Sequence, residues 1–400
     1  MFHNAPSRFF WTLCFIGLFA ILSSTMSKNP VLKPFSTSLG TPEALLGIVA
    51  AASTIPGILV SFPAGWLSDV FGRRKLLFTS CVVFASAPFL YLFVSSWWQL
   101  VLVRFYHGFA TAIFVPVSNA TIAELFPTKR GERISTFSSA TIIGRSVAPL
   151  LGGSILFITV NNYRELYVIV GVAGIISLFT ALIYLKEITS TNFNKTLEKM
   201  KSRKNTSVLQ DWSKIAGNKG ILIVGILEAS QYYTFGAVEF FLVGYLQDIA
   251  TMNLLLVGII LGAQPIIISL TKPFMGKLSD KIGRRTPIII GSLITSFLLI
   301  AIPLTVDFPI LLVLSILYGL GFSLVTSSTP ALVSELTQKE NYGATMGFLA
   351  TIMDIGQTIG PIMSGIILAS TMGYIGLFGS LSTIILVTTG IFFASKTAKA

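Results

Sequence analysis

Four ionisable side chains stand inside long apolar stretches of this chain, where a charge is costly. Arg104 and Arg145 lie in the first half, and Glu228 and Asp354 lie in the second. Within a membrane, such groups face a cavity or a partner, and they mark substrate or ion pathways. A carboxyl group in a cavity can bind and release a proton, because burial disfavours its charged form. Asp354 and Glu228 are therefore the predicted proton carriers.

Polar and aromatic neighbours extend this predicted pathway. Glu228 is followed by Gln231, Tyr232 and Tyr233, and His107 comes three residues after Arg104. The two arginines have a second possible role, because a guanidinium also binds carboxylate or phosphate groups. Arg104 also lies only about 9 Å along the helix axis from the predicted start of its span. Its side chain could therefore extend to the outer surface instead of into the protein. The sequence leaves open whether Arg145 and Asp354 meet.

Membrane-spanning helices must position these residues. Of the 400 residues, 53% are hydrophobic and only 11% are charged, and a span needs about 20 apolar residues. Apolar runs of that length recur throughout the chain and predict an all-α integral membrane protein. The twelve predicted spans are 9–27, 44–63, 76–95, 98–121, 135–158, 166–185, 221–246, 251–273, 287–305, 308–333, 343–369 and 374–395.

The distribution of basic residues predicts how the spans are oriented. Lys and Arg gather in alternate loops, as expected of the loops that stay in the cytoplasm. This pattern predicts a multi-pass protein of the plasma membrane with both termini cytoplasmic. It also accounts for the net charge of +12 without nucleic acid as a partner. We predict no metal or other cofactor, because Cys14 and Cys81 lie in apolar runs and the two histidines are far apart.

The second half of the chain repeats the first at an offset of 211 residues. The repeated loop motif contains Gly65, Asp69, Gly72, Arg73 and Arg74, which match Gly276, Asp280, Gly283, Arg284 and Arg285. The same offset relates Glu124 to Glu335, and one residue more relates Gly144 and Pro149 to Gly356 and Pro361. We therefore predict two six-helix bundles, 1–185 and 221–400, related by a pseudo-two-fold axis along the membrane normal and joined by a cytoplasmic linker at 186–220.

With these motifs the chain resembles the major facilitator superfamily over nearly its whole length. The resemblance implies alternating access between the two bundles, with the repeated loops acting as cytoplasmic gates. It assigns that latching role to Asp69, Arg73 and Arg74, and more weakly to Asp280, Arg284 and Arg285. The alternative is that these arginines only set the orientation of the chain in the membrane.

Two further motifs resemble the twelve-span drug:proton antiporter branch of that family. In span 4, Arg104 and Gly108 match the branch pattern, which implies that Arg104 assists proton transfer, but His107 stands where the branch has Gln. Span 5 resembles the antiporter motif, with Ala148 where the family has Gly. Its packing residues are Gly144, Pro149, Gly152 and Gly153, and span 11 carries the relatives Gly356, Gly360 and Pro361.

The prediction is a secondary transporter that exports a small amphipathic or drug-like molecule in exchange for protons. Its expected partners are this substrate and the lipid bilayer, and a monomer suffices. A symporter or uniporter for a sugar, organic acid or inorganic anion is the first alternative, and a transport-inactive membrane sensor is the second. Span 1 has no acidic residue, unlike several drug exporters, which leaves the coupling site open. An enzyme is disfavoured because no nucleophile–base or metal constellation is present.

Overall fold

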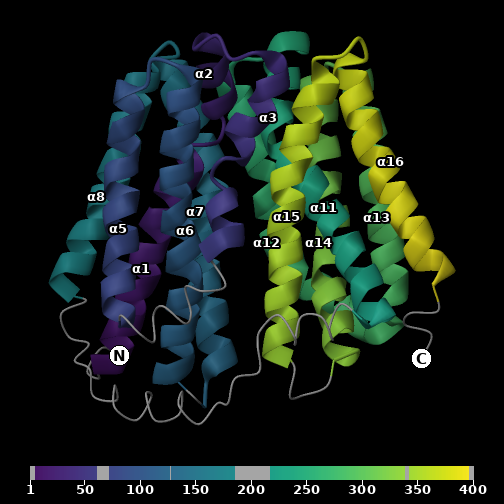
Figure 1. Ribbon diagram of the computed structural model, residues 1–400, viewed down its shortest axis with the longest axis horizontal. Helices are drawn as coiled ribbons and strands as arrows, with labels where there is room; N and C mark the ends of the chain where they lie inside the picture. Colours follow the sequence, from purple (N-terminus) through teal and green to yellow (C-terminus); the bar gives the residue numbers. More distant parts are fainter. Residues whose placement is uncertain (1–4, 61–71, 127, 185–216, 338–341, 396–400) are drawn as a thin grey trace. The chain divides into compact units, whose positions relative to one another are not determined.

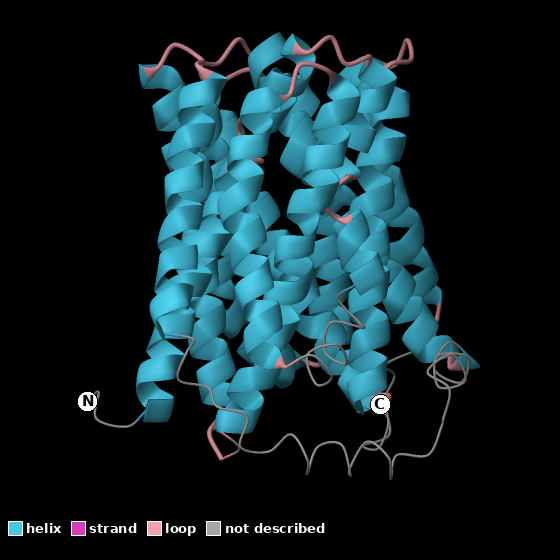
Figure 2. Ribbon diagram, turned by 60° about the vertical axis from the view of Figure 1, so that its left-hand side comes forward, coloured by secondary structure: helices cyan, strands magenta, loops and turns pink. Residues whose placement is uncertain are grey.

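The structure is a computed structural model that describes residues 5–60, 72–126, 128–184, 217–337 and 342–395. These residues form helices and connecting loops, and no strand occurs among them (Figure 2). Twelve of the described helical segments are long and apolar enough to cross a membrane, as predicted. The predicted linker 186–220 lies almost entirely outside the described residues, as do Gly65 and Asp69.

The contacts divide the chain into two compact units, which are labelled by helix in Figure 1. The N-terminal unit comprises residues up to Val31 and Ala52–Thr206, and the C-terminal unit comprises Leu32–Ala51 and Ser207–Ala400. The division differs from the predicted one because residues 32–51, from the first half of the sequence, pack with the second half. The physical reason is close packing of this segment against helix α15 (Tyr342–Leu368), where a Cβ on Gly47 would overlap the backbone carbonyl of Pro361.

The N-terminal unit is built from long helices that run back and forth. Its described helices are α1 (Ala5–Met26), α5 (Arg73–Leu90), the short η1 (Tyr91–Phe93), α6 (Trp97–Leu125), α7 (Arg130–Ile158) and α8 (Tyr163–Tyr184). Helix α1 packs against α7 and α8, and α5 packs against α6 and α8. Buried aromatic rings fill the centre, with Phe114 6.0 Å from Phe137 and 5.8 Å from Phe84. Burial of such large rings contributes much of the stability of the unit.

The C-terminal unit repeats this plan and adds two short helices. Its helices are α2 (Leu32–Ser38), α3 (Glu43–Ala51), α11 (Lys219–Gly244), η3 (Tyr245–Ile249), α12 (Leu254–Ile282), α13 (Arg285–Ala301), η4 (Ile302–Leu304), α14 (Phe308–Glu335), α15 (Tyr342–Leu368) and α16 (Gly373–Ala394). Asn218 caps α11 by accepting hydrogen bonds from the backbone N–H groups of Gly220 and Ile221. Helix α11 packs along α15, and α14 packs between α12 and α13. Val224, Val325 and Phe392 belong to the apolar core.

Many large apolar side chains remain exposed on the outer surfaces of both units. Phe179 in α8 is 62% exposed and Phe297 in α13 is 70% exposed. A protein surrounded by water avoids such apolar surface, whereas lipid tails accept it. The exposed phenylalanines therefore fit lipid-facing positions.

Candidate functional site

A buried polar cluster in the N-terminal unit surrounds Arg104. This arginine lies on α6 with only 2% of its surface exposed, and its Nη2 donates a hydrogen bond to Ser53 Oγ. It also interacts with the hydroxyl group of Tyr91. The side chain therefore points into the unit, and it does not extend to the surface as the alternative from sequence would require. The guanidinium is thus in contact with hydroxyl groups from two other parts of the unit.

His107 lies one turn further along α6 and belongs to the same cluster. Its Nδ1 lies 3.4 Å from Ser27 Oγ and 3.4 Å from the Tyr91 hydroxyl group. The ring of Tyr91 stacks on Tyr167 with 4.4 Å between centroids, which fixes that hydroxyl group. The buried Nε2 of His107 has no hydrogen-bond partner among the described residues. Arg104 and His107 are thus brought together, as their spacing on one helix predicts.

In the C-terminal unit, Glu228 is the buried acidic residue. It lies on α11 with no exposed surface, and Thr329 of α14 donates a hydrogen bond to its Oε2. Its Oε1 is buried without a hydrogen-bond partner in the described part of the chain. Lys272 on α12 is a cation whose charge acts on this carboxyl group. Nearby on α11, Gln231 donates a hydrogen bond of 3.2 Å to Ser292 Oγ.

The two units carry corresponding polar contacts at the repeat positions. Arg104 contacts Ser53 in the N-terminal unit, and 211 positions later Ser315 accepts a 3.0 Å hydrogen bond from Gln264. Only the N-terminal contact contains a charge. The acidic residue is present only in the C-terminal unit, because the position in α1 that corresponds to Glu228 is Gly17. The two units therefore differ at these positions, with a buried cation in one and a buried carboxyl group in the other.

The aromatic residues predicted on this helix separate into two positions. Tyr232 is partly exposed and meets the ring of Phe322 edge-on, with 5.5 Å between centroids, while Phe235 stacks on the same ring at 4.9 Å. Tyr233 instead presents its backbone carbonyl to Gly360 of α15. Tyr232, Phe235 and Phe322 thus form an aromatic cluster that α11 and α14 share.

Arg145 and Asp354 occupy less buried positions than Arg104 and Glu228. Arg145 is exposed on α7 of the N-terminal unit, and Asp354 is partly exposed on α15 of the C-terminal unit. Their side chains are accessible to a solute or to water in a way that those of Arg104 and Glu228 are not.

The repeated loop motif has the same backbone turn in both units. Gly72 and Gly283 adopt φ values of 89° and 85°, in a backbone region that residues other than glycine rarely adopt. Immediately after the first turn, Arg73 forms an ion pair of 3.2 Å with Glu124 at the end of α6. Gly276 lies in open space at the end of α12. Arg74, the next residue of the motif, is exposed.

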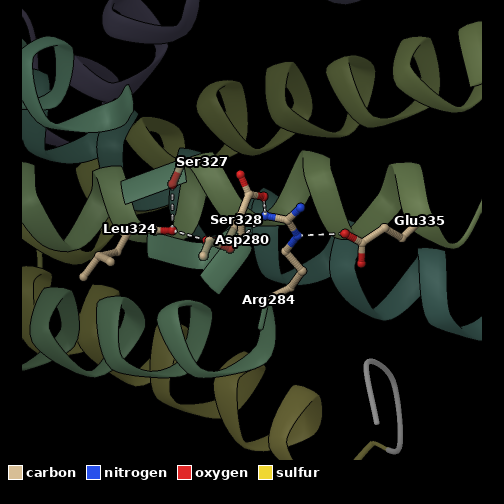
Figure 3. Close-up of polar contacts among 7 residues, drawn as sticks. Asp280, Arg284, Leu324, Ser327, Ser328 and Glu335 are labelled. Atoms are coloured by element: carbon tan, nitrogen blue, oxygen red, sulfur yellow. Dashed lines mark hydrogen bonds and ion pairs between the residues drawn. The ribbon is translucent and has the colours of Figure 1, made fainter. Parts of the chain in front are cut away.

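Arg284 holds the corresponding loop of the C-terminal unit. It forms ion pairs with Asp280 and with Glu335, where the distance from Nε to Oε1 is 2.8 Å (Figure 3). Its Nη1 also donates to Ser279 Oγ at 3.3 Å. Partial burial lowers the pKa of Arg284, but the bonds to Glu335 and Asp280 outweigh it and raise the pKa above its usual value. Arg285 instead donates to the backbone carbonyl of Ser395, at 3.0 Å.

The glycine motifs of spans 5 and 11 are sites of close helix contact. A Cβ on Gly144 would overlap the carbonyl of Leu18 in α1, and a Cβ on Gly356 would overlap the carbonyl of Ala229 in α11. Leu18 and Ala229 are themselves related by the 211-residue offset. Gly152 packs near the carbonyl of Asn29, Gly153 is buried, and Pro149 and Pro361 lie inside α7 and α15.

Sequence reasoning missed the neutral partners in these clusters. Ser53, Tyr91 and Thr329 hold the charged residues, but nothing in their types distinguishes them from ordinary helix residues. Glu124 and Glu335 were recognisable, because both are repeated at the same offset as the arginines that bind them. No group of three or more His, Cys, Asp or Glu side chains that could hold a metal ion occurs within the described ranges.

Buried charges held by polar partners lie within the membrane-length helices of this protein, and comparison with known proteins gives its family. The chain belongs to the Major Facilitator Superfamily, whose family model matches residues 13–263 and 226–399. It is thus an integral multi-pass membrane protein of a transporter family, with the fold of transporters and not of enzymes.

Relatives with curated descriptions include several transporters. An uncharacterized MFS-type transporter of Methanocaldococcus jannaschii is 24% identical over 363 residues, covering 90% of this chain and 91% of that protein. A multi-drug resistance efflux pump PmrA homolog of Lactococcus lactis is 26% identical, covering 89% and 87%. Among solved structures, a bacterial homolog of the human lysosomal transporter Spinster aligns with a TM-score of 0.81 at 16% identity, covering 99% and 98%.

Proposed function

We propose that this transporter exports a small amphipathic molecule in exchange for protons, and that Glu228 carries the proton. The observation that supports it best is the setting of Glu228, which is fully buried with one oxygen bonded to Thr329 and the other without a partner. An ionised carboxylate in such a place is expensive, whereas a protonated one is tolerated. Binding or release of a proton by Glu228 would therefore change the stability of this conformation of the C-terminal unit.

Export is supported by the relatives and by the motif in α7. A multi-drug resistance efflux pump PmrA homolog of Lactococcus lactis and the multidrug resistance protein MdtG of Proteus mirabilis are each 26% identical to this chain. Other relatives differ in cargo, including a riboflavin transporter of Clostridioides difficile at 22% identity. The aromatic cluster of Tyr232, Phe235 and Phe322 would suit the flat apolar face of an amphipathic substrate. By the basic-residue pattern, both termini would lie in the cytoplasm of the cell whose plasma membrane holds the protein.

The test separates proton coupling from transport itself. Purified protein in liposomes is assayed for uphill dye transport driven by a pH gradient and for exchange of dye across the membrane without a gradient. The variants are Glu228→Gln, which mimics the protonated acid, and Asp354→Asn, with Glu165→Gln in an exposed position as the control. We expect Glu228→Gln to abolish uphill transport and to retain exchange. Uphill transport that survives in Glu228→Gln would reject Glu228 as the proton carrier, and a parent protein that shows exchange without uphill transport would reject the antiport proposal.

A symporter or uniporter for a small anion is the second candidate, and one observation favours it. Arg145 is exposed within a predicted span although a lone cation there is costly. A substrate carboxylate or phosphate would offset that cost through paired hydrogen bonds. Uptake of a labelled organic acid that is lost in Arg145→Gln, together with no dye transport, would favour this candidate.

A further inference from the structure

Two buried oxygen atoms on one turn of α11 have no hydrogen-bond partner in the described part of the chain. They are Oε1 of Glu228 and Oε1 of Gln231, and neither side chain has any exposed surface. Residues three positions apart lie on the same face of a helix, with about 5–6 Å between their Cβ atoms. A buried polar atom without a partner is costly, so two on one helix face indicate that a water molecule or an ion binds there.

Two neighbouring helices supply further oxygen atoms to the same place. Thr329 of α14 donates a hydrogen bond to Glu228 Oε2, and Ser292 of α13 accepts a 3.2 Å hydrogen bond from Gln231 Nε2. Helix α13 packs on α14, so both hydroxyl groups reach the same turn of α11. Each hydroxyl oxygen still has a lone pair for another partner. We call Glu228, Gln231, Ser292 and Thr329 the oxygen cluster.

The oxygen cluster is enclosed by apolar side chains. Leu227, Ile288 and Val325, which lie within one turn of the cluster on α11, α13 and α14, belong to one apolar core and have no exposed surface. Electrostatic interactions are strong in such surroundings, because no bulk water screens them. An ionised carboxylate is stable there only when a cation compensates its charge.

The ligand types indicate which cation fits the cluster. One carboxylate with neutral amide and hydroxyl oxygens carries a single negative charge, which a monovalent ion balances. Divalent ions are usually held by more carboxylates, and transition metals by imidazole or thiolate groups. Lys272, exposed on α12, is a neighbouring cation whose charge acts on Glu228, and it disfavours a second positive charge in the cluster. The chemistry therefore favours an alkali cation.

The N-terminal unit has no such cluster at the corresponding positions. The positions 211 residues before the carboxyl and amide ligands hold Gly17 and Ala20, which have no side-chain oxygen. The ring of Phe137 packs beside the first of them, because a Cβ on Gly17 would lie 2.9 Å from Phe137 Cε2. The oxygen cluster is thus a property of the C-terminal unit and does not come from the repeat.

We propose that the oxygen cluster binds a dehydrated alkali cation, with Na⁺ as its probe, and that Glu228 and Gln231 are the ligands that Thr329 and Ser292 hold in place. Na⁺ is then a coupling ion of this transporter. The proposal shares with the proposed function only the use of Glu228 as the ion-binding group. Binding of Na⁺ requires neither a substrate nor a proton gradient.

The experiment measures sodium binding to the purified protein in detergent. Thermal unfolding is followed at one pH and one ionic strength while sodium chloride replaces choline chloride. At about 100 times the half-saturating concentration, we expect the melting temperature to rise on the order of 5 °C, because an ion that binds only the folded state stabilises it. Equilibrium dialysis against radioactive sodium measures the affinity directly.

The variants remove one ligand at a time. We expect Glu228→Gln and Gln231→Leu each to weaken sodium binding on the order of tenfold or more. Gln264→Leu is the matched control, because Gln264 also donates a buried 3.0 Å hydrogen bond, to Ser315 Oγ, and has apolar residues one turn away on either side. It loses the same kind of bond and is expected to keep the parent response to sodium.

A change that tightens binding guards against variants that merely fold poorly. Lys272→Gln removes the neighbouring positive charge, so we expect it to increase the affinity for sodium about threefold. Damage to the fold would lower the affinity instead. Thr329→Ser keeps the hydroxyl group and is expected to bind sodium as the parent does.

Three results would overturn the proposal. The first is a parent protein that binds no sodium, which would mean that water satisfies both oxygens. The second is equal stabilisation by sodium and choline chloride, and the third is a sodium response that Glu228→Gln and Gln231→Leu leave unchanged. Proton-driven dye transport that depends on Glu228 in a protein without sodium binding would refute the sodium site alone. Sodium binding that depends on Glu228 in a protein without proton-driven transport would support the site and refute the proposed antiport.

Discussion

Arg284 is joined to Glu335 by an ion pair, and the two residues 211 positions earlier, Arg73 and Glu124, are joined in the same way. Each pair ties the loop that follows one span to the far end of another span of the same unit. The loop motif therefore has a structural role inside each unit, whatever it does between conformations. The gating role implied by family resemblance stays a prediction.

The Arg284–Glu335 pair is expected to contribute measurably to stability. Glu335 is 54% exposed, so we discount the charge interaction for solvent screening and expect a coupling of about 0.5–1 kcal/mol. The measurement is a double-mutant cycle of Arg284→Gln and Glu335→Gln on thermal unfolding in detergent. Lys129 and Glu132, 4.0 Å apart and both about as exposed, provide the control pair, with coupling near zero. Equal coupling in both pairs would contradict the prediction.

Thr329 is expected to support Glu228 through its hydroxyl group. Thr329→Val keeps the shape of the side chain and removes the donor, which leaves the Glu228 carboxyl group with no hydrogen bond at either oxygen. We expect a loss of about 1–3 kcal/mol of stability, seen as a lower melting temperature, and weaker uphill transport. Thr329→Ser keeps the donor and is expected to stay near the parent in both measurements. A harmless Thr329→Val would show that Glu228 does not need this bond.

The glycines at helix contacts are expected to tolerate no side chain. Gly144→Ala and Gly356→Ala would each push a methyl group into a backbone carbonyl of the neighbouring helix, so we expect low yields of folded protein. Gly379→Ala is the control, because nothing lies within 4 Å of the added methyl group. That change favours helix by roughly 0.5–1 kcal/mol and is expected to leave yield unchanged or raise it. The readout is the fraction of monodisperse protein after extraction in detergent.

Arg104 is expected to be irreplaceable by lysine. Its guanidinium reaches both Ser53 and Tyr91, and a single ammonium group cannot reproduce that planar geometry. We expect Arg104→Lys to fold and to lose most uphill transport. His107→Gln is expected to retain most transport, because an amide nitrogen can still bond to the Ser27 and Tyr91 hydroxyl groups. Full activity of Arg104→Lys would mean that only the charge matters at this position.

Sequence alone predicted the spans and the family because both depend on local patterns. Apolar runs mark helices in a membrane, and the repeated Gly72–Arg73 and Gly283–Arg284 turns mark the internal duplication. The pairing of these arginines with Glu124 and Glu335 was within reach, since all four residues obey one offset.

The partners of the buried charges could not be predicted in the same way. Thr329 is 101 residues from Glu228, and one among many threonines carries no signal of such a contact. The ion pair between Lys33 and Asp248 could not be predicted for a different reason. From sequence, Lys33 lies in a predicted loop between two spans, and only the fold shows that it is buried against Asp248. The sharing of one span between two units also has no sequence signature beyond Gly47 and Pro56.

That shared span limits how far the two repeats are autonomous. A C-terminal fragment that begins after the central linker would lack residues 32–51, and with them the backbone that covers Pro361 and the cation that neutralises Asp248. A C-terminal half produced alone would therefore expose the strip of α15 that residues 32–51 cover in the intact chain.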